Sequence, residues 1–103
     1  MYRINVYIPA THLDSVKQAM FSAGAGKIGN YAQCCWQVKG VGQFEPLVGS
    51  DAFIGETGRL EQVDEYKVEL VCESDVIHQV IDALKLSHPY EEPAYDVYQP
   101  VVF

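Results

Sequence analysis

The sequence predicts an α+β domain of the ferredoxin-like type, a split βαβ sandwich in which two helices cover one face of an antiparallel sheet. Two amphipathic helical patterns each follow a strand pattern, and each is followed in turn by another strand. Right-handed crossovers then place both helices on the same face. A short extra strand and a long loop separate the two units. With 103 residues the chain has room for one core, so we expect a single domain over residues 1–103.

Composition excludes several classes of protein. Apolar residues make up 49% of the chain and charged residues 20%, which argues against disorder. No apolar run approaches the roughly 18 residues of a membrane span, and the N-terminal segment alternates like a strand rather than following a signal-peptide layout. We therefore expect a cytoplasmic protein. Three cysteines, including the adjacent pair Cys34 and Cys35, favour reduced thiols over a disulfide framework.

The net charge of −7 disfavours both nucleic acids and membranes as partners, because each requires a basic surface. The charge is unevenly distributed. Residues 1–44 contain four basic residues and one acidic residue, whereas residues 45–103 contain thirteen acidic residues and three basic ones. A solvated acidic face is the simpler explanation of this asymmetry, and self-association of unlike halves is the alternative.

Residues 2–8 predict a half-buried strand, since apolar and polar side chains alternate until Pro9. A helix of about 12 residues is expected next, because apolar residues recur at helical spacing until Gly24. Thr11 and Asp14 are spaced as in a variant capping box at the start of that helix. The apolar residues of this helix are Leu13, Val16, Met20 and Ala23.

The segment 24–30 has the G-x-G-x-x-G spacing found in dinucleotide-binding loops. That fingerprint requires glycines that leave a strand and open a helix, whereas these leave a helix and enter a strand. Helix termination and a tight turn are therefore the favoured interpretation. The alternative is a small anion nest made by Lys27 and glycine amides. The candidate ligand-binding residues of this segment are Gly24, Gly26, Lys27, Gly29 and Asn30.

Alternation returns in residues 31–39, which predict a second strand with Cys34 in the core and Cys35 on the opposite face. We expect Gly40 and Gly42 to flank a tight connection, followed by a short edge strand over residues 43–46.

Residues 47–59 have no helical or strand period and contain three glycines. They predict a loop whose two interpretations are a series of turns and a flap that covers a ligand.

Residues 60–72 predict a long strand in which Tyr66, Val68, Leu70 and Cys72 share one face. A second helix should begin with Ser74 as its cap and end before Pro89. His12 and His78 are expected at the surface. A last strand then covers residues 94–98, and the many strand tyrosines predict an assembly surface on the open sheet face.

The stretch from His88 to Tyr98 is the densest in chemistry and supports three interpretations. It forms a rigid turn shaped by prolines, a ligand site, or a site for a divalent or transition metal ion. The rigid turn is favoured. The candidate ligand-binding residues are His88, Tyr90, Glu91 and Glu92. The candidate metal ligands are His88, Glu91 and Glu92, to which Cys35 or Asp96 is the possible addition.

Catalysis is disfavoured because the chain has no complete catalytic constellation. His88 beside Glu91 is a conceivable base with its orienting group, yet no serine or cysteine lies in a nucleophile elbow. The sequence therefore favours a binding protein over an enzyme, and no residue is assigned a catalytic role.

Several motifs together resemble a known family. The chain is similar to the insert domain of bacterial NGG-one-interacting factor three-like proteins, also called GTP cyclohydrolase one type two homologues. The matching motifs are Gly24-Ala-Gly-Lys-Ile-Gly-Asn-Tyr31 with Cys34 and Trp36, Gly42-Gln-Phe-Glu-Pro46, Gly49-Ser50, Gly55, Gly58, Glu61-Gln-Val-Asp-Glu65 and His88-Pro-Tyr-Glu-Glu-Pro-Ala-Tyr-Asp-Val-Tyr98.

This resemblance implies a stand-alone insert with a PII-like or CutA-like fold, a group whose members commonly form trimers. It also implies a small homo-oligomeric binding or regulatory module whose partners are further copies of itself and a small molecule or protein. The two-metal centre of the full-length family lies on flanking motifs that this chain lacks. No metal ligand or hydrolase activity is therefore carried over from the family.

Overall fold

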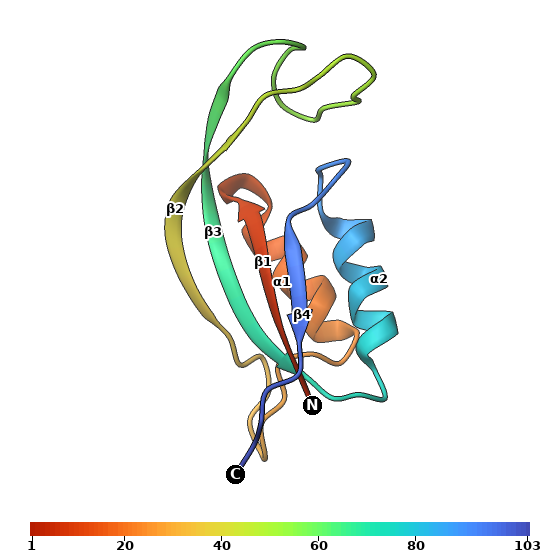
Figure 1. Ribbon diagram of the computed structural model, residues 1–103. Coiled ribbons are helices and arrows are strands. Elements are labelled where there is room, and N and C mark those ends of the chain that lie inside the picture. Colours follow the sequence, from red (N-terminus) through yellow and green to blue (C-terminus); the bar gives the residue numbers. More distant parts are fainter.

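The computed structural model describes residues 1–103 as a four-stranded antiparallel sheet with two helices on one face (Figure 1). The strand order is β2-β3-β1-β4 and every neighbouring pair is antiparallel. This arrangement confirms the predicted split βαβ fold class. The elements are β1 (Tyr2–Pro9), a 3-10 turn (Ala10–His12), α1 (Leu13–Ser22), β2 (Trp36–Phe44), β3 (Glu61–Cys72), α2 (Ile77–Ser87) and β4 (Tyr95–Tyr98).

The core lies between the helices and one face of the central strands. Alternate residues of β1 point into it, and the register pairs Ile4 with Leu70 and Val6 with Val68, so both strands bury the same face. Val16 of α1 packs in the same cluster, which also contains Ile8, Met20, Ala25, Cys72, Val80 and Leu84. The predicted alternation in β1 and β3 is confirmed. Neither helix is long and apolar enough to cross a membrane.

Both predicted helix caps are wrong. The Thr11 hydroxyl is bonded to Nδ1 of His12 at 2.8 Å instead of reaching a helix amide, and α1 begins after the 3-10 turn. Ser74 accepts a bond from the N-terminal amine of Met1 at 3.3 Å, and α2 begins only at Ile77. In both places the chain makes a short turn before the helix, which moves the expected capping residue away from the first helical amides.

The second strand differs from its prediction at both ends. It begins at Trp36 instead of Tyr31 and runs unbroken to Phe44, through Gly40 and Gly42. Both glycines keep an ordinary strand conformation because β3 lies alongside the whole segment and fixes its register. The tight connection and separate edge strand expected at 40–46 are therefore incorrect.

Cys34 was expected in the core, yet it lies before β2 and is only half buried. Cys72 at the end of β3 is the buried cysteine. Desolvation by burial raises the pKa of the Cys72 thiol.

The sheet face opposite the helices is open and only partly aromatic. By register it carries Tyr7 of β1, Trp36 and Val38 of β2 and Tyr98 of β4, all of which are exposed. The expectation of a tyrosine-rich face is corrected, because Tyr2, Tyr66 and Tyr95 lie on the helix side and Tyr31 lies outside the strands.

The long loop predicted from the sequence is present and joins β2 to β3 over residues 45–60. In Figure 1 this yellow-green segment extends beyond the ends of β1 and β4 and lies above the connection from α2 to β4. The connection between α1 and β2, drawn in orange, lies at the other end of the sheet. The two candidate ligand segments of the sequence, 24–30 and 88–92, are therefore far apart.

Candidate functional site

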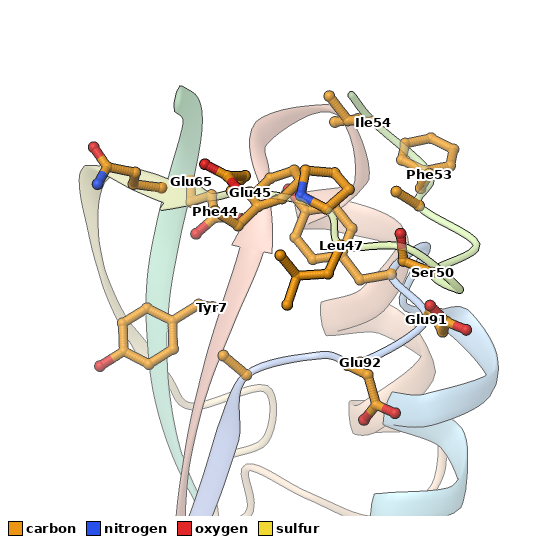
Figure 2. Close-up of a pocket in the computed structure, with 15 residues that line it drawn as sticks. Tyr7, Phe44, Glu45, Leu47, Ser50, Phe53, Ile54, Glu65, Glu91 and Glu92 are labelled. Atoms are coloured by element: carbon orange, nitrogen blue, oxygen red, sulfur yellow. Dashed lines mark hydrogen bonds between the residues drawn. The ribbon is translucent and has the colours of Figure 1, made fainter. Parts of the chain in front are cut away.

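A pocket of about 410 Å³ lies between the 45–60 loop and the connection from α2 to β4 (Figure 2). The loop supplies seven of its fifteen lining residues and so forms much of its wall. In Figure 2, Leu47 projects from the loop toward the connection that carries Glu92. The lining residues are Tyr7, Gln43, Phe44, Glu45, Pro46, Leu47, Ser50, Ala52, Phe53, Ile54, Glu65, Tyr90, Glu91, Glu92 and Ala94.

The loop is held over the pocket by a small number of specific contacts. The Asp51 amide donates to Oε1 of Glu91 at 2.9 Å, which joins the loop to the connection after α2. The Phe53 ring packs edge-on against His12, with centroids 5.3 Å apart. Pro46 is buried, and its carbonyl accepts the Gly58 amide at 2.7 Å, which closes the base of the loop.

His88 is a buried structural residue at the start of the connection from α2 to β4, and it does not line the pocket itself. The residue is only 5% exposed. Nε2 of its ring lies 2.7 Å from the Tyr7 carbonyl oxygen, and Nδ1 accepts the Tyr90 amide at 3.1 Å. A carbonyl oxygen only accepts, so Nε2 carries the proton and the ring is neutral. Desolvation by burial lowers the pKa of His88, in agreement with this hydrogen bonding.

The structure does not bring His88, Glu91 and Glu92 together as metal ligands. Both ring nitrogens of His88 already have backbone partners, and Glu91 accepts the Asp51 amide. Asp96 accepts a bond from Asn5 at 2.9 Å. No group of three or more His, Cys, Asp or Glu side chains is arranged to hold a metal ion.

Tyr90 stands at the centre of the aromatic wall. Its ring centroid lies 5.9 Å from that of Phe44 and 6.4 Å from that of Phe53. Its hydroxyl donates to Oε2 of Glu65 at 2.9 Å. Burial, together with this bond to Glu65, raises the pKa of Tyr90 well above its ordinary value. The Tyr90 hydroxyl therefore links the connection between α2 and β4 to the N-terminal half of β3.

Four carboxylates line the pocket, and none of its lining residues is Lys, Arg or His. Glu65 and Glu91 are engaged by the donors described above. Glu45 and Glu92 are exposed and make no hydrogen bond or ion pair with the protein. The site thus combines apolar walls with two free negative charges.

The glycine segment has a structural role. The amides of Gly24 and Gly26 donate to the carbonyls of Phe21 and Val71, so they are not free to form an anion nest. Gly26 has a positive φ of 78°, and a Cβ there would lie within 3.0 Å of the Phe21 ring and the Cys34 carbonyl. Lys27, Gly29 and Asn30 are exposed around a small hairpin and do not line the pocket.

A second, smaller pocket of about 210 Å³ lies near this hairpin. Cys34 and Cys35 both contribute to it, together with Trp36 and Arg3. It is separate from the site beneath the 45–60 loop, with which it shares no lining residue.

Sequence reasoning found Tyr90, Glu91 and Glu92 but missed most of the pocket. The missed residues are apolar side chains of the loop and the carboxylate of Glu65. One signal was present: Phe44, Leu47 and Phe53 are large apolar residues in or beside a segment with no strand or helix period. Such residues need something to pack against, which indicates a folded loop and not a free one.

Comparison with known proteins finds relatives that are longer than this chain, and one segment of each relative is similar to it. The GTP cyclohydrolase 1 type 2 homolog of Halalkalibacterium halodurans is 47% identical over 98 residues, which cover 95% of this chain and 26% of the relative. The Bacillus subtilis protein of the same name is 46% identical over 96 residues, or 93% of this chain and 26% of the relative. The chain thus spans about a quarter of the curated relatives it matches. No family model matches it.

A solved structure gives the same result. A Bacillus cereus protein related to NIF3 has a TM-score of 0.79 and 40% identity, with 94% of this chain and 24% of that chain covered. The predicted resemblance is confirmed. The similarity to NIF3-related proteins extends over nearly the whole of this chain, but in each relative it is limited to one segment of a longer sequence.

More distant structures support the fold alone. The periplasmic divalent cation tolerance protein CutA of Archaeoglobus fulgidus has a TM-score of 0.66 at 16% identity, covering 97% of this chain and 84% of that one. A complex of B. subtilis GlnK with ATP has a TM-score of 0.53 at 15% identity, covering 97% and 82%. The CutA-like and PII-like character expected for the fold is confirmed.

Proposed function

We propose that the protein is a small homo-oligomeric binding module that holds a small organic molecule beneath the 45–60 loop. The observation that carries this proposal is the pocket of about 410 Å³, within the range of ligand sites. Its walls are mainly aliphatic and aromatic, with a small number of polar groups at defined positions. This composition is typical of sites that recognise small molecules.

Self-association rests on a separate feature, the open sheet face. Trp36, Val38 and Tyr98 are exposed there, on the face that also carries Asn5, a buried residue whose Oδ1 has no hydrogen-bond partner. Large apolar side chains exposed on a sheet face that no helix covers are typical of an interface. The resemblance to PII-like and CutA-like proteins implies that the assembly is a trimer.

Ligand binding is tested by screening a fragment library with cationic, neutral and anionic members, using two-dimensional amide NMR spectra. We expect the shifted amides to cluster at Leu47, Phe53 and Tyr90. Phe53→Ala should weaken those hits, whereas Leu86→Ala should leave them unchanged, because Leu86 is 89% exposed on α2. A library that produces no shifts at the pocket contradicts the binding function.

Assembly is tested by size-exclusion chromatography with light scattering. Wild type should elute at a multiple of the 11.5 kDa chain mass, and Trp36→Asp with Val38→Asp should return it to that mass. Leu86→Asp with His78→Asp is the matched control, since the pair adds the same two negative charges at exposed positions of α2 on the helix side. A wild-type monomer at micromolar concentration removes the oligomer from the proposal.

A further inference from the structure

The charge of the pocket defines the chemical class of its ligand. We propose that the pocket binds an organic cation, an amine carried on an apolar or aromatic body. This inference rests on the proposed binding function and adds the sign of the ligand's charge to it.

The lining of the pocket is negatively charged. Glu45, Glu65, Glu91 and Glu92 all contribute to it, and no basic side chain does. Arg59, the one Lys or Arg of the 45–60 loop, lies outside the lining and is paired with Glu56 at 3.6 Å. An anion placed here meets several negative charges and no neutralising partner, whereas a cation is attracted by all of them.

Two of the four lining carboxylates are available to a ligand. Glu65 receives the Tyr90 hydroxyl, and Glu91 receives the Asp51 amide, so both help to build the wall. Glu45 and Glu92 have no protein donor and are exposed. An ammonium group beside either of them satisfies an acceptor that the fold leaves free, and it remains in contact with water because both side chains are exposed.

Aromatic rings form one wall of the pocket. The rings of Phe44, Tyr90 and Phe53 form a row in which neighbouring centroids are 5.9 and 6.4 Å apart. Aromatic faces attract cations and also pack against an apolar body. The side chain of Leu47 adds an aliphatic surface beside them (Figure 2). An amphipathic amine therefore matches both parts of the site.

The same features disfavour nucleotides and other phosphate esters. A related fold is known in complex with ATP, the B. subtilis GlnK described above. A polyphosphate needs basic side chains or free amides, and this pocket presents carboxylates instead. The pocket thus differs from an anion-binding site.

The test uses three probes that share one carbon skeleton and differ in charge: 4-phenylbutylamine, 4-phenylbutan-1-ol and 4-phenylbutanoate. Each is titrated into the full chain at about 20 mM salt, and dissociation constants are taken from amide shifts at the pocket. We expect the amine to bind about tenfold more tightly than the alcohol, and the butanoate to bind more weakly than both. About 150 mM salt should reduce the preference.

A matched pair of variants locates the effect. Glu45→Gln with Glu92→Gln should bring the amine to the affinity of the alcohol and leave the alcohol unchanged. The control, Glu73→Gln with Asp82→Asn, alters net charge equally at two exposed positions outside the pocket and should preserve the preference. Amide spectra of each variant report whether it is folded.

The outcomes are distinguishable. Equal binding of amine and alcohol at the pocket overturns the cation proposal and leaves the binding function standing, as does tighter binding of the butanoate. An equal loss in the control variant also overturns it, because net charge then accounts for the effect. Failure of all three probes to bind overturns the cation proposal, and the fragment screen decides whether the binding function fails with it.

Discussion

His88 is fixed in one protonation state by its two backbone partners. The Tyr7 carbonyl requires a proton on Nε2, and the Tyr90 amide requires a lone pair on Nδ1. A second proton on Nδ1 would point at the N–H of Tyr90, so this fold disfavours the charged form of the ring. Burial is the largest cause of its lowered pKa; His12 lowers it further, while the Tyr7 bond and Glu65 act in the opposite direction.

This arrangement predicts a pH dependence of stability. The folded pKa lies below the ordinary value of 6.5, so the unfolded chain binds more protons as the pH falls. The contribution of the neutral ring is complete above about pH 6.5 and is lost as the pH falls below it toward the folded pKa. We expect the free energy of unfolding in urea to decrease between about pH 6.5 and 5.

The control compares two histidines. His88→Gln keeps a donor for the Tyr7 carbonyl but cannot titrate, so its stability should vary less with pH over that interval. His78→Gln should keep the wild-type dependence, because His78 is exposed on α2. An unchanged slope in His88→Gln would show that another group titrates.

At the level of elements, β2 provides a sharp test because it contains two glycines with different neighbours. A Cβ added at Gly42 would overlap the Glu65 carboxylate, whereas a Cβ at Gly40 meets nothing within 4 Å. Gly40→Ala should stabilise the protein by about 0.5 kcal/mol by restricting the unfolded chain. Gly42→Ala moves the acceptor of Tyr90 and should be about 1 kcal/mol less stable than Gly40→Ala.

Denaturant unfolding of the two variants measures this difference. Tyr90→Phe in each background identifies the cause: it should destabilise Gly40→Ala and have little effect in Gly42→Ala, where the bond to Glu65 is already broken. Equal stability of the two alanine variants would mean that Glu65 finds another position at no cost.

The loop makes a second prediction at this scale. Phe53 contacts His12 and Tyr90, so its removal should release residues 47–58 from the body of the protein. We expect Phe53→Ala to increase amide hydrogen exchange in this segment about fivefold, the equivalent of ~1 kcal/mol of aromatic packing. Val48→Ala is the control, because Val48 is 93% exposed in the same loop and should change little.

These elements also show what sequence patterns can predict. The alternation of Ile4, Val6 and Ile8 is local, so periodicity was enough to assign β1 and its buried face. Gly40 and Gly42 suggested a break for local reasons, yet pairing with β3 decides their conformation. The predicted capping residues were wrong for a similar reason. A short turn precedes each helix, and the local sequence did not predict its length.

The pocket was less predictable than the fold, because its walls come from distant parts of the chain. Glu65 and Tyr90 are 25 residues apart and meet only through the sheet topology. His88 looked like a ligand because its type is common in metal sites, but burial and backbone bonds give it a structural role. Tyr90, Glu91 and Glu92 were found because polar residues were concentrated in a connection.

For the whole molecule, charge and the open sheet face act together on assembly. Each chain carries a net charge of −7, so copies repel one another at long range. Where β1 pairs with β3 and β4, the open face carries by register two basic residues, Arg3 and Lys67, and three acidic ones, so its charges nearly balance there. The acidic residues are Glu65, Glu69 and Asp96, and Lys67 is paired with Glu69 at 3.1 Å. Tyr7 lines the pocket and also lies on this face, so the binding site borders the proposed interface.

Salt therefore distinguishes the two explanations of the uneven charge. If copies meet through the open face, electrostatic repulsion between the acidic chains opposes assembly. Raising the salt concentration from about 10 to 150 mM weakens this repulsion, because the screening length falls from about 30 to 8 Å. We expect sedimentation velocity to show severalfold tighter self-association at the higher salt. Attraction between the basic 1–44 half of one copy and the acidic 45–103 half of another predicts weaker association instead. Because apolar contacts across Trp36 and Val38 are insensitive to this change, a double variant at those positions should lose association at both salt concentrations.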